Sequence, residues 1–103
     1  ENVTLRGIIP VYPGYSSEDE GVLDCLGNLS NDSTPCLVVM GLYDKVVPPT
    51  AAEEYKAAYD AAGAKCAAVE ISFAGHSCDY FMSGRSNQLI TYCAERFMAA
   101  LSV

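Results

Sequence analysis

With 103 residues and a mass of 11.0 kDa, the chain has room for one small domain, and its 50% apolar residues predict a globular core rather than disorder. Thirteen acidic against six basic residues give a net charge of −7, and no basic cluster exists that could neutralise nucleic-acid phosphates or an anionic lipid surface. The longest apolar run, CLVVMGLY, is far shorter than the roughly 20 residues that span a bilayer, so we expect neither a nucleic-acid partner nor a membrane anchor.

The first half of the chain predicts two strands separated by a polar loop. Leu5–Tyr12, LRGIIPVY, is rich in branched residues and precedes a Pro-Gly turn, which indicates a buried strand weakened only by Pro10. Residues 15–35 are polar and predict a loop with at most one short helix, Glu18–Leu26. Cys36–Gly41, CLVVMG, is apolar without alternation, which is typical of a central parallel strand covered on both faces.

The second half predicts a helix, a strand and a helix. Thr50 and Glu53 form a T-x-x-E capping box, and Gly63 suits a left-handed C-cap, so a helix is expected between them. A third strand is expected at Cys66–Ser72 and a last helix at Asn87–Leu101. The faces expected to pack on the sheet are Ala51, Tyr55, Ala58, Tyr59 and Ala62 in the first helix and Leu89, Ile90, Cys93, Phe97 and Leu101 in the last.

The order strand, strand, helix, strand, helix predicts an α/β fold. Alternating strands and helices form a parallel sheet with right-handed crossovers, and ligands bind at the carboxyl ends of its strands. Asp44 follows the strand at Cys36–Gly41, and His76 follows the strand at Cys66–Ser72. Because neighbouring strands end at one edge of the sheet, we expect these two side chains to lie within hydrogen-bond reach.

This pair has two thirds of the chemistry of a catalytic triad. An Asp bonded to one imidazole nitrogen fixes the tautomer of the ring and leaves the other nitrogen to take a proton from a hydroxyl or thiol. Each residue also has an ordinary alternative role, since a lone His is often structural and an Asp in a turn such as that of Asp44 often caps its own backbone. Asp79 is a weaker candidate for the acid, because it lies only three residues after His76 and would contort that loop.

The segments PCLVVMGLYDKVVPP and AAGAKCAAVEISFAGHS resemble the C-terminal part of an α/β-hydrolase of the esterase, dienelactone-hydrolase or prolyl-peptidase-like kind. In that family the acid follows the penultimate core strand and the His follows the last. The resemblance therefore implies a three-layer sandwich in which Asp44 and His76 are the acid and base of a Ser-His-Asp triad. It is firmest over Thr34–Val103 and places Leu5–Tyr12 after the nucleophile-bearing helix. Residues 1–103 are thus expected to be a partial α/β-hydrolase domain whose nucleophile-bearing part lies upstream.

The same family order excludes Ser77 as the nucleophile. The triad runs Ser, then acid, then His, whereas His76 is the only histidine and precedes Ser77. In GHSCD, moreover, Asp79 stands where the nucleophile elbow needs Gly. The chain has no other G-x-S-x-G and no oxyanion loop, so alone it is expected to be inactive. Its partner would be the upstream segment of the same domain, carrying a Ser or, less expectedly, a Cys.

The expected function is hydrolysis of a small-molecule carboxylic ester, or less readily of a peptide, without a cofactor. No metal is expected, since one His and no C-x-x-C pair give no ligand set. The alternative is a non-catalytic hydrolase-like binding domain, which a substituted upstream elbow would favour. A self-contained flavodoxin-like domain ranks last, because three strands make a small sheet and no phosphate-cradling loop follows the first strand.

The cysteines and glycosylation sequons indicate a secretory origin, with a cytoplasmic one as the alternative. Five cysteines is a high number for this length, and three N-x-S/T sequons begin at Asn2, Asn28 and Asn31. Candidate disulfides are Cys25 to Cys36 and Cys78 to Cys93, although Cys36, Cys66 and Cys93 equally suit buried apolar positions.

Overall fold

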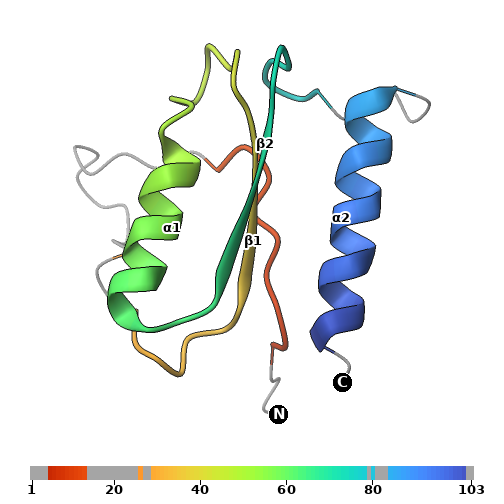
Figure 1. The fold of residues 1–103 in the computed structure, drawn as a ribbon. Helices are drawn as coiled ribbons and strands as arrows, with labels where there is room; N and C mark the ends of the chain where they lie inside the picture. Colours follow the sequence, from red (N-terminus) through yellow and green to blue (C-terminus); the bar gives the residue numbers. More distant parts are fainter. Residues whose placement is uncertain (1–4, 14–25, 27–28, 79, 81–83, 102–103) are drawn as a thin grey trace.

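The computed structural model describes residues 5–13, 26, 29–78, 80 and 84–101. These contain the strands β1 (Cys36–Gly41) and β2 (Cys66–Ile71) and the helices α1 (Ala51–Ala62) and α2 (Arg85–Leu101). The two strands pair in parallel, with the first and last residues of β1 opposite the first and last residues of β2. Helix α1 covers one face of the sheet and α2 the other (Figure 1), which confirms the expected α/β class with three layers.

Strand β1 is the centre of the fold. Its bounds are those predicted, and all six of its residues are buried, as a parallel strand covered on both faces requires. Strand β2 lies at the edge and is only partly buried. The core between β1 and α1 is formed by Cys36, Val38, Met40, Val47, Ala51, Ala52, Tyr55, Tyr59 and Ala64.

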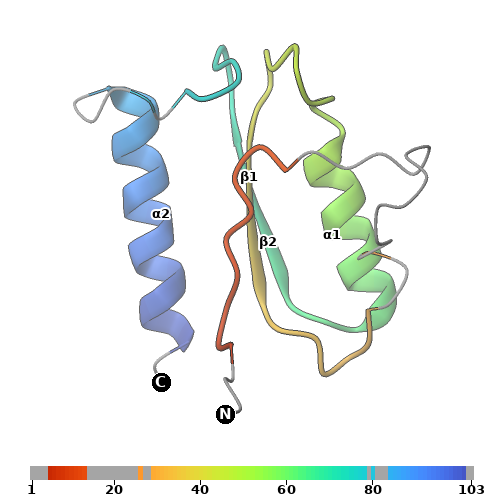
Figure 2. The same ribbon diagram turned by 180° about the vertical axis from the view of Figure 1, so that it is seen from behind.

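The N-terminal segment (residues 5–13) lies along the other side of β1 from β2 (Figure 2). It was expected to be a continuous strand, but it forms only isolated parallel bridges at Ile8 and Val11. The physical reason is Pro10. Its carbonyl accepts a hydrogen bond from β1, at Val39 N, over 2.9 Å, yet proline has no N–H to return one, so the ladder is interrupted there.

Helix α1 ends as predicted but begins differently. Gly63 adopts the left-handed conformation, with φ 76°, and its N–H bonds to the carbonyls of the last turn. The predicted capping box is wrong, because Thr50 already has helical angles and its side chain makes no capping hydrogen bond. The N–H of Ala51 instead donates to the carbonyl of Pro48 over 2.9 Å.

Helix α2 begins at Arg85, two residues earlier than predicted, and presents a narrower apolar face. Ile90 is its buried residue, and Cys93, Phe97 and Leu101 are half-buried. Leu89 was also expected in the core but is 42% exposed. Neighbouring helical residues point about 100° apart, so Leu89 cannot share the direction of Ile90.

Several expectations fall outside the described residues. They are the short helix at Glu18–Leu26 except for Leu26, the rival acid Asp79, Cys25 with its pairing to Cys36, and the sequons at Asn2 and Asn28. Asn31 is described and exposed. In the part of the chain that the structure describes, no helix is long and apolar enough to cross a membrane.

Candidate active site

The loops that follow β1 and β2 meet at the carboxyl edge of the sheet, at the top of Figure 1. We call residues 72–78, which follow β2, the His loop. The N–H of Tyr43, two residues beyond β1, donates to the carbonyl of Ala74 in the His loop over 2.8 Å. The N–H of Asp44 turns back to the carbonyl of Gly41 over 3.1 Å. These bonds hold the loop of Asp44 directly against that of His76.

Asp44 is a buried carboxylate with a partner on each oxygen. The N–H groups of Val46 and Val47 both donate to Oδ1, each over 2.8 Å, and His76 Nδ1 lies 2.8 Å from Oδ2. Burial raises the pKa of this carboxyl, but the hydrogen bonds from Val47, His76 and Val46 together outweigh it and bring the pKa below its ordinary value. Asp44 is therefore ionised at neutral pH, although its residue is only 5% exposed.

His76 receives its orientation from this carboxylate. Since ionised Asp44 can only accept a hydrogen bond, the proton of the neutral imidazole sits on Nδ1 and Nε2 keeps its lone pair. The His76 side chain is 35% exposed, and no described residue makes a hydrogen bond to Nε2. The prediction that Asp44 and His76 lie within hydrogen-bond reach is confirmed. The Nε2 atom of the ring can accept a proton from a group outside the described residues. The catalytic role of the pair stays a prediction.

A third residue, Tyr12, which the sequence did not reveal, contacts His76. The ring centroid of Tyr12 lies 5.1 Å from that of His76, and the Tyr12 hydroxyl lies 3.0 Å from Cys78 Sγ. Tyr12 follows the last bridge of the N-terminal segment, at the same edge of the sheet as the two loops. In the sequence the only sign of this contact is that Tyr12 ends the predicted strand Leu5–Tyr12. Aromatic residues at strand ends are common in ordinary packing, so this sign is weak.

Gly41 is required where the two loops touch. A Cβ added there would lie 2.8 Å from the carbonyl oxygen of Gly75 and still closer to that of Ala74. Both are backbone atoms of the His loop, so the loop itself would have to move.

We expect Gly41→Ala to lower the free energy of unfolding by about 1–3 kcal/mol and to disturb the bond between Asp44 and His76. The matched control is Gly75→Ala, whose added Cβ would lie 3.8 Å from the carbonyl of Tyr43, an ordinary contact. Urea denaturation of both variants checks the prediction, and equal losses would show that the contact at Gly41 is not specific.

The cysteines do not form the predicted bridge between Cys78 and Cys93. Cys78 belongs to the His loop, where its thiol lies beside the Tyr12 hydroxyl. Cys93 lies in α2, eight residues after the start of that helix, which is about 12 Å along the helix axis.

At the other end of the sheet, burial raises the pKa of the Cys66 thiol and also raises the pKa of the neighbouring Tyr59 hydroxyl, to about 12. Tyr59 is a buried core residue, and Cys66 is partly buried and packs against the same core.

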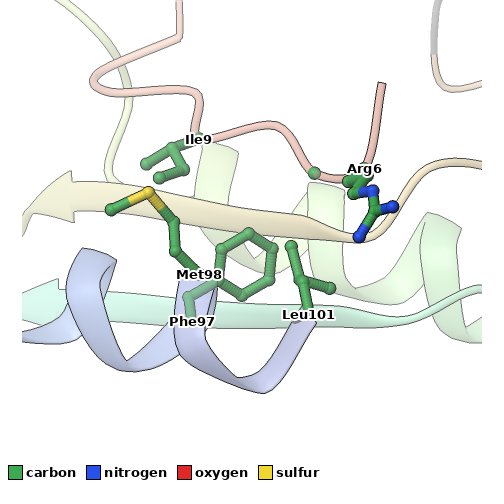
Figure 3. A pocket seen from close by; sticks show the side chains of 6 residues that line it. Arg6, Ile9, Phe97, Met98 and Leu101 are labelled. Atoms are coloured by element: carbon green, nitrogen blue, oxygen red, sulfur yellow. The ribbon is translucent and has the colours of Figure 1, made fainter. Parts of the chain in front are cut away.

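A hollow at that opposite end has no part in the site. It measures about 320 Å³ and lies between the N-terminal segment and the end of α2 (Figure 3). Its walls are apolar apart from Arg6, and a Cβ on Gly7 would come within 3.0 Å of the Phe97 ring. Within the described residues no group of three or more His, Cys, Asp or Glu could hold a metal ion.

Comparison with known proteins places this geometry in a familiar fold. The sequence matches no protein-family model and no curated protein. The propionate-bound structure of Est2, a thermophilic esterase from the planctomycete Thermogutta terrifontis, superposes on 93% of this chain with a TM-score of 0.78 and 18% identity. The native structure of Est2 covers 74% of the chain with a TM-score of 0.67 and 22% identity.

The chain spans less than half of the esterase that it matches, 43% of the propionate-bound structure and 28% of the native one. At these identities the likeness shows the fold, which is that of part of an α/β-class esterase. The predicted α/β fold class is thereby confirmed, and membership of the α/β-hydrolase superfamily stays a prediction.

Proposed function

We propose that the chain supplies the acid and the base of a Ser-His-Asp triad in a carboxylic ester hydrolase. The observation that carries the proposal is the 2.8 Å bond from His76 Nδ1 to Asp44 Oδ2 at the carboxyl edge of a parallel sheet. A buried, ionised carboxylate on one side of the imidazole, with the other nitrogen able to accept a proton, is the arrangement that general-base catalysis by a triad requires.

In this mechanism a Ser on the upstream segment of the same domain attacks the ester carbonyl. His76 Nε2 takes the proton of the Ser hydroxyl as the new C–O bond forms, and then gives it to the leaving alcohol as the old C–O bond breaks. A water molecule next attacks the acyl-enzyme, giving one proton to Nε2, which returns it to the Ser as the carboxylic acid leaves. Asp44 stays ionised throughout and stabilises the imidazolium that forms twice in the cycle.

The fold comparison supports an ester substrate. Both Est2 structures are of an esterase, and one of them holds propionate, the carboxylate that hydrolysis of a propionyl ester releases. We extend this to the present chain as a proposal of short-chain carboxylic esters. Fold alone does not determine function, so the chemistry of Asp44 and His76 is the stronger support.

We expect a fluorophosphonate probe to label the complete polypeptide, upstream segment included, on a Ser outside the present 103 residues. Such a probe phosphonylates a Ser only when a base activates it. The labelled residue is identified by mass spectrometry of the digested protein, and hydrolysis of p-nitrophenyl acetate and propionate is followed in parallel.

A folded polypeptide that neither reacts with the probe nor hydrolyses the esters would favour the non-catalytic binding domain instead. Reaction with a thiol-directed probe, lost when an upstream Cys is replaced, would show that the nucleophile is Cys.

A further inference from the structure

Tyr12 lies at the edge of the sheet where Asp44 and His76 meet, and its backbone is bonded to the central strand. Its backbone φ is 49°, in a region where a bulky side chain persists only when its surroundings hold it. One contact that holds Tyr12 in this conformation is a backbone hydrogen bond: its N–H donates to the carbonyl of Val39 in β1 over 3.0 Å. The aromatic ring is thus anchored to the central strand rather than carried on a free loop.

From this anchor Tyr12 contacts the His loop at two points. Its ring lies against that of His76, with centroids 5.1 Å apart and planes tilted by 51°. Its hydroxyl shares a part-buried hydrogen bond of 3.0 Å with Cys78 Sγ, and either atom can be the donor. Ser77, between these two points, has φ 57°, so the loop is pinned on both sides of a left-handed residue.

The contact complements the one from Asp44. A single hydrogen bond at Nδ1 fixes the position of that nitrogen, but the imidazole can still tilt about the bond and carry Nε2 away from its target. The Tyr12 ring, tilted against the imidazole at a centroid distance of 5.1 Å, restricts that freedom. The hydrogen bond to Cys78 in turn stops the Tyr12 ring and the His loop from separating.

We propose that Tyr12 is a positioning residue for His76, with Cys78 as the thiol that holds it in place. The inference rests on the proposed function, in which the direction of Nε2 decides how well the proton of the nucleophile is taken. Misplacing a reacting group by about 1 Å can cost about 100-fold in rate. The N-terminal segment and the loops after β1 and β2 then contribute to one base: Tyr12 orients its ring, Asp44 fixes its tautomer, and His76 itself transfers the proton.

The first test is a double-mutant cycle in the complete polypeptide, with the second-order rate of fluorophosphonate labelling as the readout. Tyr12→Phe and Cys78→Ala each remove one side of the same hydrogen bond, so each is expected to slow labelling by about threefold to tenfold. The double variant is expected to lose no more than either single one. Cys78→Ser keeps a hydrogen-bonding group and is expected to restore labelling to within about twofold of wild type.

Tyr12→Ala removes the ring as well and is expected to slow labelling by up to about 100-fold. The control is Tyr92→Phe, a loss of one hydroxyl from a Tyr that is 61% exposed on α2, which should leave the rate unchanged. Additive losses in the cycle, or wild-type labelling by Tyr12→Ala, would overturn the proposal.

A second readout does not depend on esterase activity. Carbon-13 relaxation of the His76 ring, assigned by its absence in His76→Ala, reports the mobility of the imidazole on the picosecond to nanosecond scale. We expect Tyr12→Ala to increase this mobility and Tyr92→Phe to leave it unchanged. If the wild type is not labelled at all, the proposed function fails while this measurement still decides whether Tyr12 holds the ring. Slower labelling by Tyr12→Ala with an unchanged ring mobility would reject positioning.

Discussion

His76→Ala is expected to lower kcat for ester hydrolysis, and the rate of fluorophosphonate labelling, by about 10⁴-fold to 10⁶-fold in the complete polypeptide. In the proposed mechanism this imidazole moves every proton, and His76 is the only histidine of the chain. Asp44 is buried behind the ring and cannot reach a nucleophile in its place. Binding of the ester and polarisation of its carbonyl do not involve His76, so the KM should change far less than kcat.

The matched control is Ser77→Ala, which alters the adjacent exposed residue and is expected to retain labelling and activity. Its outcome also tests the order argument that excluded Ser77 as the nucleophile. If the probe instead modified Ser77, or if His76→Ala were labelled at the wild-type rate, the proposed triad would be wrong. Circular dichroism of both variants shows whether the fold is kept.

The parts of the fold that the sequence predicted well are those fixed by burial. The run of apolar residues at Cys36–Gly41 has no polar face to turn to water, so it predicts a strand covered on both sides, and its bounds agree with the structure. Gly63 was predictable because a left-handed C-cap excludes most other residues. The meeting of Asp44 and His76 followed from topology alone, since adjacent parallel strands end at one edge.

The parts that sequence did not predict depend on conformations that residue types do not signal. Tyr12 and Ser77 both have a left-handed backbone conformation. Residues other than glycine rarely adopt positive φ, so their residue types gave no reason to expect it. Without those angles the contact of Tyr12 with His76 and Cys78 cannot be anticipated. The T-x-x-E pattern at Thr50 failed for a related reason, since the chain enters the helix through a turn at Pro48 that already satisfies the first free N–H.

Asp44 has two roles in the structure, and one substitution separates them. Its Oδ1 accepts two backbone N–H groups of its own turn, while its Oδ2 accepts the proton of His76 Nδ1. In Asp44→Asn the amide oxygen can keep the turn, but the NH₂ group then faces Nδ1 and donates to it. The neutral ring would carry its proton on Nε2, where it blocks proton transfer from the nucleophile.

We therefore expect Asp44→Asn to fold and to lower kcat by about 10³-fold to 10⁴-fold. Nitrogen-15 shifts of the His76 ring should show the exchange of tautomer directly. Asp44→Ala removes the acceptors of the turn as well, so it should also lose about 1–3 kcal/mol of stability through the unsatisfied N–H of buried Val47.

The pH dependence of stability tests what the charge of Asp44 contributes to the fold. In the folded chain the pKa of Asp44 lies below its ordinary value of 3.8, because its hydrogen bonds outweigh the effect of burial. The ionised carboxylate therefore stabilises the fold fully above pH 3.8, and this contribution is lost as the pH falls through the folded pKa. Asp44→Asn has no charge to lose at this position, so its deficit in unfolding free energy should be largest near neutral pH and shrink in acid. If the variant shows this deficit but keeps wild-type kcat, the charge of Asp44 stabilises the fold and has no part in catalysis.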